Sequence, residues 1–246
     1  MIEFKEATKV YGKSEHPALD RLTLTVQDGS VFGFLGPNGA GKTTAIRLLT
    51  GVLRPTSGTV LVNGTDVTKD PVAVKKMIGF VPDSQEMYER LTGMEYLQFM
   101  ADIFGVSEAD RKQRIDQYLT MFELTGAAND RIQGYSRGMK QKISVIGALI
   151  HKPPIFVLDE PMVGLDPKAS FLLKEEMRAQ AKEGVTVFFS THVLEVAEKL
   201  CDQVGIIHHG QLLTQGTPEA LREKTGDASL EQVFLDLTES EEAEAE

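Results

Sequence analysis

The chain has no tryptophan and a single cysteine, Cys201, among its 246 residues. One cysteine cannot form an intramolecular disulfide and has no second thiolate for a metal site, which is typical of a protein from a reducing compartment. Long hydrophobic runs are also missing, since no stretch approaches the roughly 18 uninterrupted apolar residues of a membrane span. The first eleven residues carry four charged side chains where a signal peptide has an apolar core. These absences predict a cytoplasmic chain.

Positive charge is scarce. Lysine and arginine number 26 against 36 aspartates and glutamates, which gives a net charge of −10. This balance argues against a nucleic-acid backbone as the main partner. Five of the acids lie in the last eight residues, and a run of this kind is most often a solvated, disordered end rather than a binding element. The remaining composition, with 41% apolar and 25% charged residues, indicates one globular domain or a core with an inserted lobe.

The order of hydrophobic patterns predicts an α/β fold. Alternating residues at 2–4 and 22–26 favour half-buried strands in a small antiparallel lobe. Between about 91 and 150 the apolar residues repeat at the spacing of one helical face, which indicates an inserted helical lobe, bounded at about 85–150. Continuous apolar runs favour strands buried on both faces of a mostly parallel sheet, and they occur at 31–35, 155–158, 185–189 and 205–207.

A glycine-rich segment follows the first of these buried runs. Residues 36–43 read Gly-Pro-Asn-Gly-Ala-Gly-Lys-Thr and precede a predicted helix, which is the context that a phosphate-binding P-loop requires. Glycines let successive N–H groups point at phosphate oxygens, and the helix N-terminus adds partial positive charge. Lys42 would reach the β and γ phosphates, and Thr43 would bind Mg²⁺. We therefore predict that ATP is bound by Gly36, Pro37, Asn38, Gly39, Ala40, Gly41, Lys42, Thr43 and Thr44.

Two adjacent acids, Asp159 and Glu160, end the apolar run at 155–158. The carboxyl ends of the strands are the edge of an α/β sheet where ligands bind. Taken alone, such a pair is more often a solvated turn or a helix cap. Beside a phosphate loop, Asp159 is placed to hold Mg²⁺ through its water shell, and Glu160 is free to orient or deprotonate the attacking water.

Three further segments complete an ordered set of motifs: Tyr-Ser-Arg-Gly-Met-Lys-Gln at 135–141, Gly-Leu-Asp at 164–166 and Ser-Thr-His at 190–192. This order resembles the ATP-binding cassette (ABC) family. The chain looks like the nucleotide-binding subunit of an ABC transporter from Tyr11 to about Pro218, which is nearly the whole folded chain. The resemblance implies a P-loop NTPase core, with one ABC ATPase domain at 1–226 and a C-terminal helix and acidic tail at 227–246. It also implies an ATPase that powers an integral membrane permease from the cytoplasmic face of the cell membrane.

The resemblance assigns the 135–141 segment to the family signature. Ser136, Gly138 and Met139 match the positions that contact the γ phosphate of ATP held by the opposite subunit, and Asp166 matches a loop that meets this subunit. The usual Leu-Ser-Gly-Gly-Gln reads Tyr-Ser-Arg-Gly-Met here, but a serine hydroxyl and a helix N-terminus suffice for a phosphate. The implied partner is a second copy of the chain or a homologous ATPase subunit.

The resemblance also assigns roles to three single positions. Tyr11 matches the aromatic residue that stacks on adenine, and His192 matches the histidine that contacts the γ phosphate. The family usually places a glutamine after the proline at position 82 to touch Mg²⁺, whereas Asp83 stands there and Gln85 lies two residues later. The spacing favours Asp83, whose oxygens suit Mg²⁺, and Gln85 stays open as a substitute. Residues 83–97 resemble the subgroup that pairs with exporter-type permeases.

Two other classes of function are alternatives to a transport ATPase. A cassette working on nucleic acid or the ribosome is disfavoured, because this chain has one cassette, no sustained heptads and an acidic balance. A small-molecule kinase or switch GTPase would carry the signature by chance, and no guanine-reading motif is evident. The transported substrate and its direction stay open, as does the choice between a homodimer and a heterodimer.

Overall fold

The structure, a computed structural model, describes the chain except for residues 13, 15, 84–86, 227–228 and 246. Gln85, the alternative to Asp83, therefore lies outside the described residues.

The main sheet of the described chain is six-stranded, in the order β10-β9-β3-β8-β7-β6. Its strands β6, β7, β8, β3 and β9 run parallel, and β10 pairs antiparallel with β9. Every residue of β3, β7 and β8 is buried, as expected for strands covered on both faces. The strands are β3 (Val31–Leu35), β6 (Ile78–Val81), β7 (Ile155–Leu158), β8 (Thr186–Thr191), β9 (Gln203–His208) and β10 (Gln211–Gly216). The predicted mostly parallel sheet is confirmed.

A second sheet forms the predicted antiparallel lobe, in the order β2-β1-β4-β5. Its strands are β1 (Ile2–Lys9), β2 (Leu19–Val26), β4 (Ser57–Val62) and β5 (Thr65–Asp66). Between the two sheets lies α1 (Lys42–Leu49), whose Ile46 and Leu49 share one apolar cluster with Phe4 and Phe34. A short helix, α2 (Pro71–Met77), begins at the capping residue Asp70 and leads into β6.

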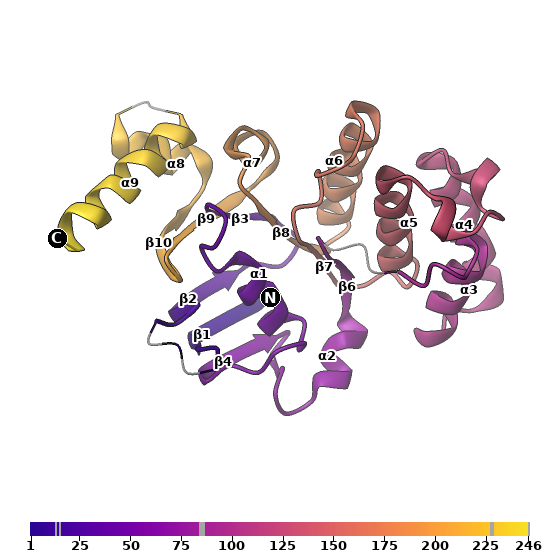
Figure 1. Cartoon of the computed structure of the whole chain (residues 1–246), viewed down its shortest axis with the longest axis horizontal. Helices are drawn as coiled ribbons and strands as arrows, with labels where there is room; N and C mark the ends of the chain where they lie inside the picture. The colour runs from indigo at the N-terminus through magenta and orange to yellow at the C-terminus, as the bar shows by residue number, and fades with distance from the viewer. Residues whose placement is uncertain (13, 15, 84–86, 227–228, 246) are drawn as a thin grey trace.

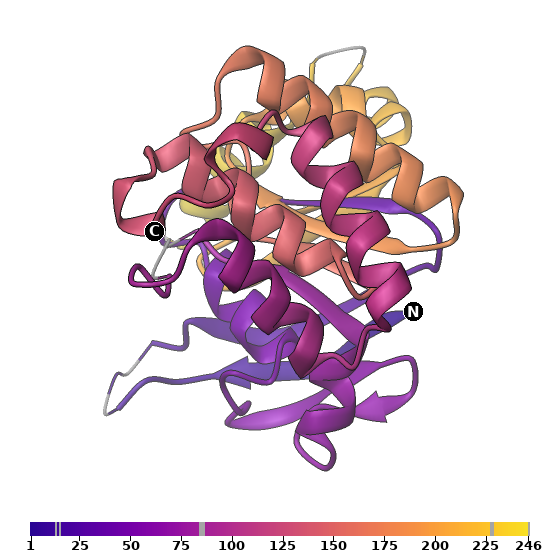
Figure 2. The ribbon, with the colours of Figure 1, turned by 90° about the vertical axis from the view of Figure 1, so that its right-hand side faces the viewer.

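The helical lobe consists of α3 (Gly93–Ile103), α4 (Glu108–Met121) and α5 (Arg137–Leu149), with 3-10 turns at Thr125–Ala127 and Ile132–Gly134. It covers the core on one side, whereas the antiparallel lobe lies below the main sheet (Figures 1 and 2). The helical elements fall within the predicted range of 85–150.

Four helices complete the described fold: α6 (Pro167–Lys182), α7 (Leu194–Leu200), α8 (Pro218–Thr225) and α9 (Leu230–Ala245). Leu230 and Val233 of α9 pack with Ala197 of α7 and Leu221 of α8 in a third apolar cluster. The helix continues to Ala245, so the prediction that the acidic run is a disordered end is wrong for the described residues. No helix among the described residues is long and apolar enough to cross a membrane.

Candidate active site

The loop between β3 and α1 is held in shape by close backbone packing. A side chain at Gly36 would place its Cβ 2.4 Å from the carbonyl oxygen of Ile207, so only glycine fits there. Gly41, which caps α1, has φ 109°, and a Cβ at this position would lie 2.6 Å from the carbonyl oxygen of Ala18. The Gly210 N–H donates to the Ala40 oxygen at 3.0 Å, which ties the loop to the β9–β10 hairpin. The loop is thus preformed at the carboxyl edge of the parallel sheet.

Lys42 lies inside this loop and is 6% exposed. Its Nζ donates to the carbonyl oxygens of Gly36 at 2.6 Å and Pro37 at 3.1 Å, and it lies 3.3 Å from Glu160 Oε1. An ammonium group surrounded by oxygens alone is poised to exchange them for phosphate oxygens.

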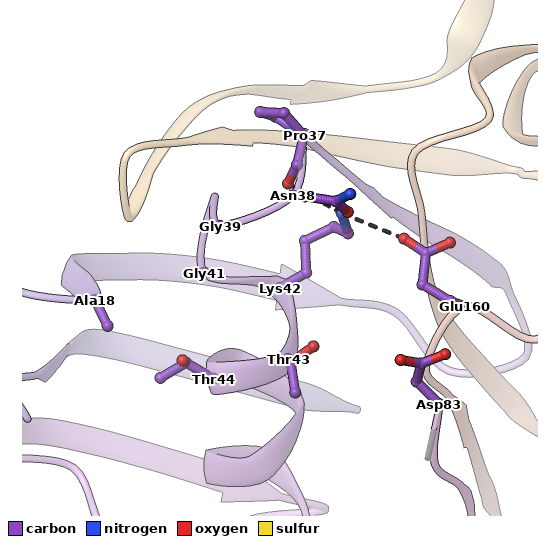
Figure 3. A pocket seen from close by; sticks show the side chains of 10 residues that line it. All are labelled: Ala18, Pro37, Asn38, Gly39, Gly41, Lys42, Thr43, Thr44, Asp83 and Glu160. Atoms are coloured by element: carbon purple, nitrogen blue, oxygen red, sulfur yellow. Dashed lines mark hydrogen bonds and ion pairs between the residues drawn. The ribbon is translucent and has the colours of Figure 1, made fainter. Parts of the chain in front are cut away.

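A cavity of about 210 Å³ opens in front of the loop. Figure 3 shows Asp83 and Glu160 facing Lys42 and Thr43 across it. The cavity is lined by Ala18, Pro37, Asn38, Gly39, Gly41, Lys42, Thr43, Thr44, Asp83 and Glu160. Gly36 and Ala40, the other predicted loop residues, shape the loop without lining the cavity. The lining residue that sequence reasoning missed, Ala18, precedes β2 and carries no chemical signature.

The two acids at the end of β7 have different surroundings. Asp159 is 2% exposed, and its Oδ1 accepts a hydrogen bond of 2.6 Å from the Ser190 hydroxyl. Glu160 points toward the cavity, where its Oε2 lies 3.0 Å from His192 Nδ1. The Glu160 carboxylate therefore sits between a lysine and a histidine, as a water-orienting base would require.

Burial raises the pKa of the Asp159 carboxyl, and hydrogen bonds from Ser190 and Thr43 oppose this rise. The charges of Asp83 and Glu160 raise the pKa further. A divalent cation would stabilise the ionised form. The oxygen donors of Thr43, Asp159 and Asp83 are of the type that Mg²⁺ prefers. Within the described residues no three acidic, histidine or cysteine side chains form a group that could hold a metal ion.

Tyr11 lies against the first turn of α1. Its hydroxyl is 3.3 Å from the Thr44 hydroxyl, and Lys9 Nζ lies 5.6 Å from its ring centroid. With 42% of the residue exposed, the ring offers a free face next to the predicted phosphate site.

The predicted signature residues do not line the cavity. Ser136 caps α5 by accepting a hydrogen bond of 3.2 Å from the Met139 N–H. Asp166 caps α6 by accepting from the Ala169 N–H, and it pairs with Lys142 of α5 at 3.4 Å. The N-termini of α5 and α6 thus form a separate surface.

A preformed phosphate loop, an acid pair at the carboxyl edge of a parallel sheet and an appended helical lobe define a P-loop nucleoside triphosphatase. Residues 19–163 match the ABC transporter family, and the chain belongs to that family.

Relatives and solved structures agree with this assignment. The chain is 36% identical to the "ABC transporter ATP-binding protein NatA" of Bacillus subtilis (strain 168), over 89% of each chain. It is 34% identical to the "Linearmycin resistance ATP-binding protein LnrL" of the same organism, over 96% of this chain and 75% of the relative. A solved "ATP binding subunit of ABC transporter" superposes with a TM-score of 0.92 at 33% identity, covering 97% of this chain and 99% of the other.

A second solved structure is described as the dimeric post-hydrolysis state of an ATP-binding cassette bound to ADP and Pi. It superposes with a TM-score of 0.81 at 25% identity, covering 88% of this chain and 98% of the other. The chain is accordingly an ATP-binding and ATP-hydrolysing subunit of the ABC transporter family, and these likenesses identify no transported substrate.

Proposed function

We propose that two copies of this chain, or one copy and a homologous subunit, close on two ATP molecules and drive a membrane permease. The observation that carries the proposal is the Glu160 carboxylate, held between Lys42 and His192 at the wall of the cavity. In this proposal Lys42 exchanges the carbonyl oxygens of its own loop for the β and γ phosphates. Tyr11 stacks on adenine with its exposed face.

Hydrolysis joins a water oxygen to the γ phosphorus and breaks the bond to the β-phosphate oxygen, which leaves ADP and phosphate. Glu160 orients the water and accepts its proton, while His192 holds the carboxylate through Oε2 and contacts the γ phosphate. Thr43, Asp159 and Asp83 would hold Mg²⁺, whose charge offsets that of the phosphates.

The second copy supplies what the cavity lacks. Ser136, Gly138 and Met139 stand at a helix N-terminus, which favours a phosphate. Because these residues lie outside the cavity of their own chain, we propose that they contact the γ phosphate held by the partner, with Asp166 at the same junction. The dimeric description of one solved relative supports this arrangement.

The permease would dock on an apolar groove of about 210 Å³ between the core and the helical lobe. Its lining includes Val52, Phe80, Met100 and Phe104, and Val52 is 59% exposed. The end of β6 links the groove to the nucleotide cavity along the chain, since Phe80 of the groove precedes Asp83 of the cavity by three residues. A permease segment seated there would place the chain on the cytoplasmic face of the membrane. The likeness of residues 83–97 to exporter-type cassettes and the resistance role in one relative's name favour export.

We propose domain limits that keep all the nucleotide-binding residues in one domain. One ABC ATPase domain spans 1–226, with the helical lobe at about 85–150. The segment at 227–246, a C-terminal helix and acidic tail, stands outside the nucleotide machinery.

Replacing Glu160 with glutamine tests the catalytic role. The variant keeps the shape of the side chain but cannot accept the proton, so we expect ATP binding at parental affinity and almost no phosphate release. Glu195→Gln, at an exposed surface ion pair, is the matched control and should hydrolyse ATP like the parent. Parental turnover in Glu160→Gln would overturn the assignment of the base.

A further inference from the structure

Ser190 is a buried hydroxyl at the end of β8 that touches both acids of the active site. The residue is 0% exposed and directly follows three apolar residues of β8, Val187, Phe188 and Phe189. Its Oγ donates to Asp159 Oδ1 at 2.6 Å and accepts from the Glu160 N–H at 2.9 Å. Because a backbone N–H cannot accept, the single hydroxyl proton must go to Asp159. The direction of both hydrogen bonds is therefore fixed.

The backbone of Glu160 needs this contact. Its φ of 47° lies in the left-handed region, which a side chain such as glutamate rarely adopts. Strained backbone of this kind persists only where the surrounding structure holds it in place. The Ser190 hydroxyl accepts a hydrogen bond from the N–H of this residue, and His192, the first residue after β8, contacts its carboxylate. One strand end thus fixes Glu160 at both its backbone and its side chain.

Asp159 is fixed in a similar way from two strands. Its N–H donates to the Val81 oxygen of β6 at 2.9 Å, and its carboxylate accepts from Ser190 of β8. The hydrogen bond from Ser190 to Oδ1 fixes the orientation of the Asp159 carboxylate. It therefore also fixes the direction in which the other carboxylate oxygen faces the cavity.

We propose that Ser190 is a positioning residue for ATP hydrolysis, which sets the geometry of Asp159 and Glu160 together without touching the nucleotide. The proposal rests on the function assigned above to these two acids. Its consequence is that replacing Ser190 lowers turnover and leaves nucleotide binding unchanged. The reason is that, among the hydrogen bonds of the described residues, Ser190 has no contact with the phosphate loop.

The test compares four variants of the full chain for turnover number, for affinity toward a fluorescent ATP analogue without Mg²⁺, and for thermal midpoint. Ser190→Ala should lower kcat by about 10- to 100-fold, as a small misplacement of catalytic groups does, with unchanged affinity for the analogue. Ser190→Thr keeps the hydroxyl and should recover most of the kcat. Ser190→Cys keeps the volume with a weaker donor and should fall between them.

Thr186→Val is the matched control. Thr186 is another buried hydroxyl, at the opposite end of β8, and it donates to Asp28 at 3.2 Å, away from the acids. It should lower the thermal midpoint without lowering kcat.

Two results would overturn the positioning role. One is parental kcat in Ser190→Ala while Glu160→Gln is inactive. The other is a loss of analogue affinity in Ser190→Ala as large as its loss of kcat. Parental turnover in Glu160→Gln would instead contradict the proposed role of Glu160, on which the inference rests. The failure of the inference and the failure of the proposed function are therefore distinguishable.

Discussion

Lys42 and Glu160 form a buried ion pair in the nucleotide cavity, with side-chain exposures of 6% and 14%. Removing one partner leaves the other charge with less compensation than it had. We expect Lys42→Met to lower the free energy of unfolding, without nucleotide, by about 1–3 kcal/mol. Adding Glu160→Gln to that variant should restore about 1 kcal/mol, because the uncompensated charge is removed. Urea denaturation of both single variants and the double variant measures this coupling, and strictly additive effects would contradict it.

His151 makes the stability of the fold depend on pH. Its ring stacks on Phe104 with 3.7 Å between the ring centroids, and in the described part of the chain neither ring nitrogen makes a hydrogen bond of normal geometry. Burial lowers the pKa of His151 from 6.5 to about 4. At pH values between 4 and 6.5 His151 is protonated in the unfolded chain and neutral in the folded chain. The free energy of unfolding therefore falls as the pH falls from 6.5 toward 4.

This histidine should contribute a loss of about 2 kcal/mol in unfolding free energy between pH 7 and pH 4. His151→Phe preserves the stacking but cannot titrate. Urea denaturation at both pH values should therefore show a smaller acid loss in this variant, and equal losses in the two proteins would contradict the assignment.

At the scale of elements, α5 shows how one residue can serve structure and function at once. Ser136 caps the helix, and it is also the proposed contact to the partner's phosphate. Ser136→Asp separates the two roles, because aspartate caps a helix as well as serine does but repels a phosphate. We expect an unchanged thermal midpoint and a loss of ATP-driven dimerisation. Ser136→Ala should instead lose about 1 kcal/mol of stability.

The strands were predictable because burial on both faces leaves continuous apolar runs, as in β3 and β7. The short helix α2 was not predicted, since Val74 is its one buried residue and leaves no periodic pattern. The role of Ser190 could not be read from the sequence either. A serine in an apolar strand signals only that a polar group is buried, and its two partners come from a loop 30 residues earlier.

At the scale of the whole molecule, sequence order alone could not show that the motifs divide into two surfaces. The phosphate loop and the acids meet at one cavity, whereas the signature segment and Asp166 cap two helices elsewhere. Figure 1 shows α5 in the helical lobe to the side of the main sheet, apart from α1, which follows the phosphate loop. A tertiary arrangement of this kind has no local sequence signal.

The proposed membrane partner gives a prediction at the same scale. The full chain, isolated from solubilised native membranes, should carry an integral membrane protein with it. Val52→Glu places a charge in the apolar groove and should reduce that recovery at least tenfold, since burying an unpaired carboxylate is costly. Val72→Glu, also at an exposed valine but outside the groove lining, is the control. Recovery of only ribosomes or DNA would contradict a transport role.

The claim that each ATP site is completed by a second copy is tested most directly by measuring the mass of Glu160→Gln in solution with ATP and Mg²⁺. The chain has a mass of 27.1 kDa, and blocked hydrolysis should trap a species of twice that mass. The same variant without ATP, and the double variant with Ser136→Asp in ATP, should remain monomers. A double variant that dimerises with ATP as fully as Glu160→Gln alone would contradict the account.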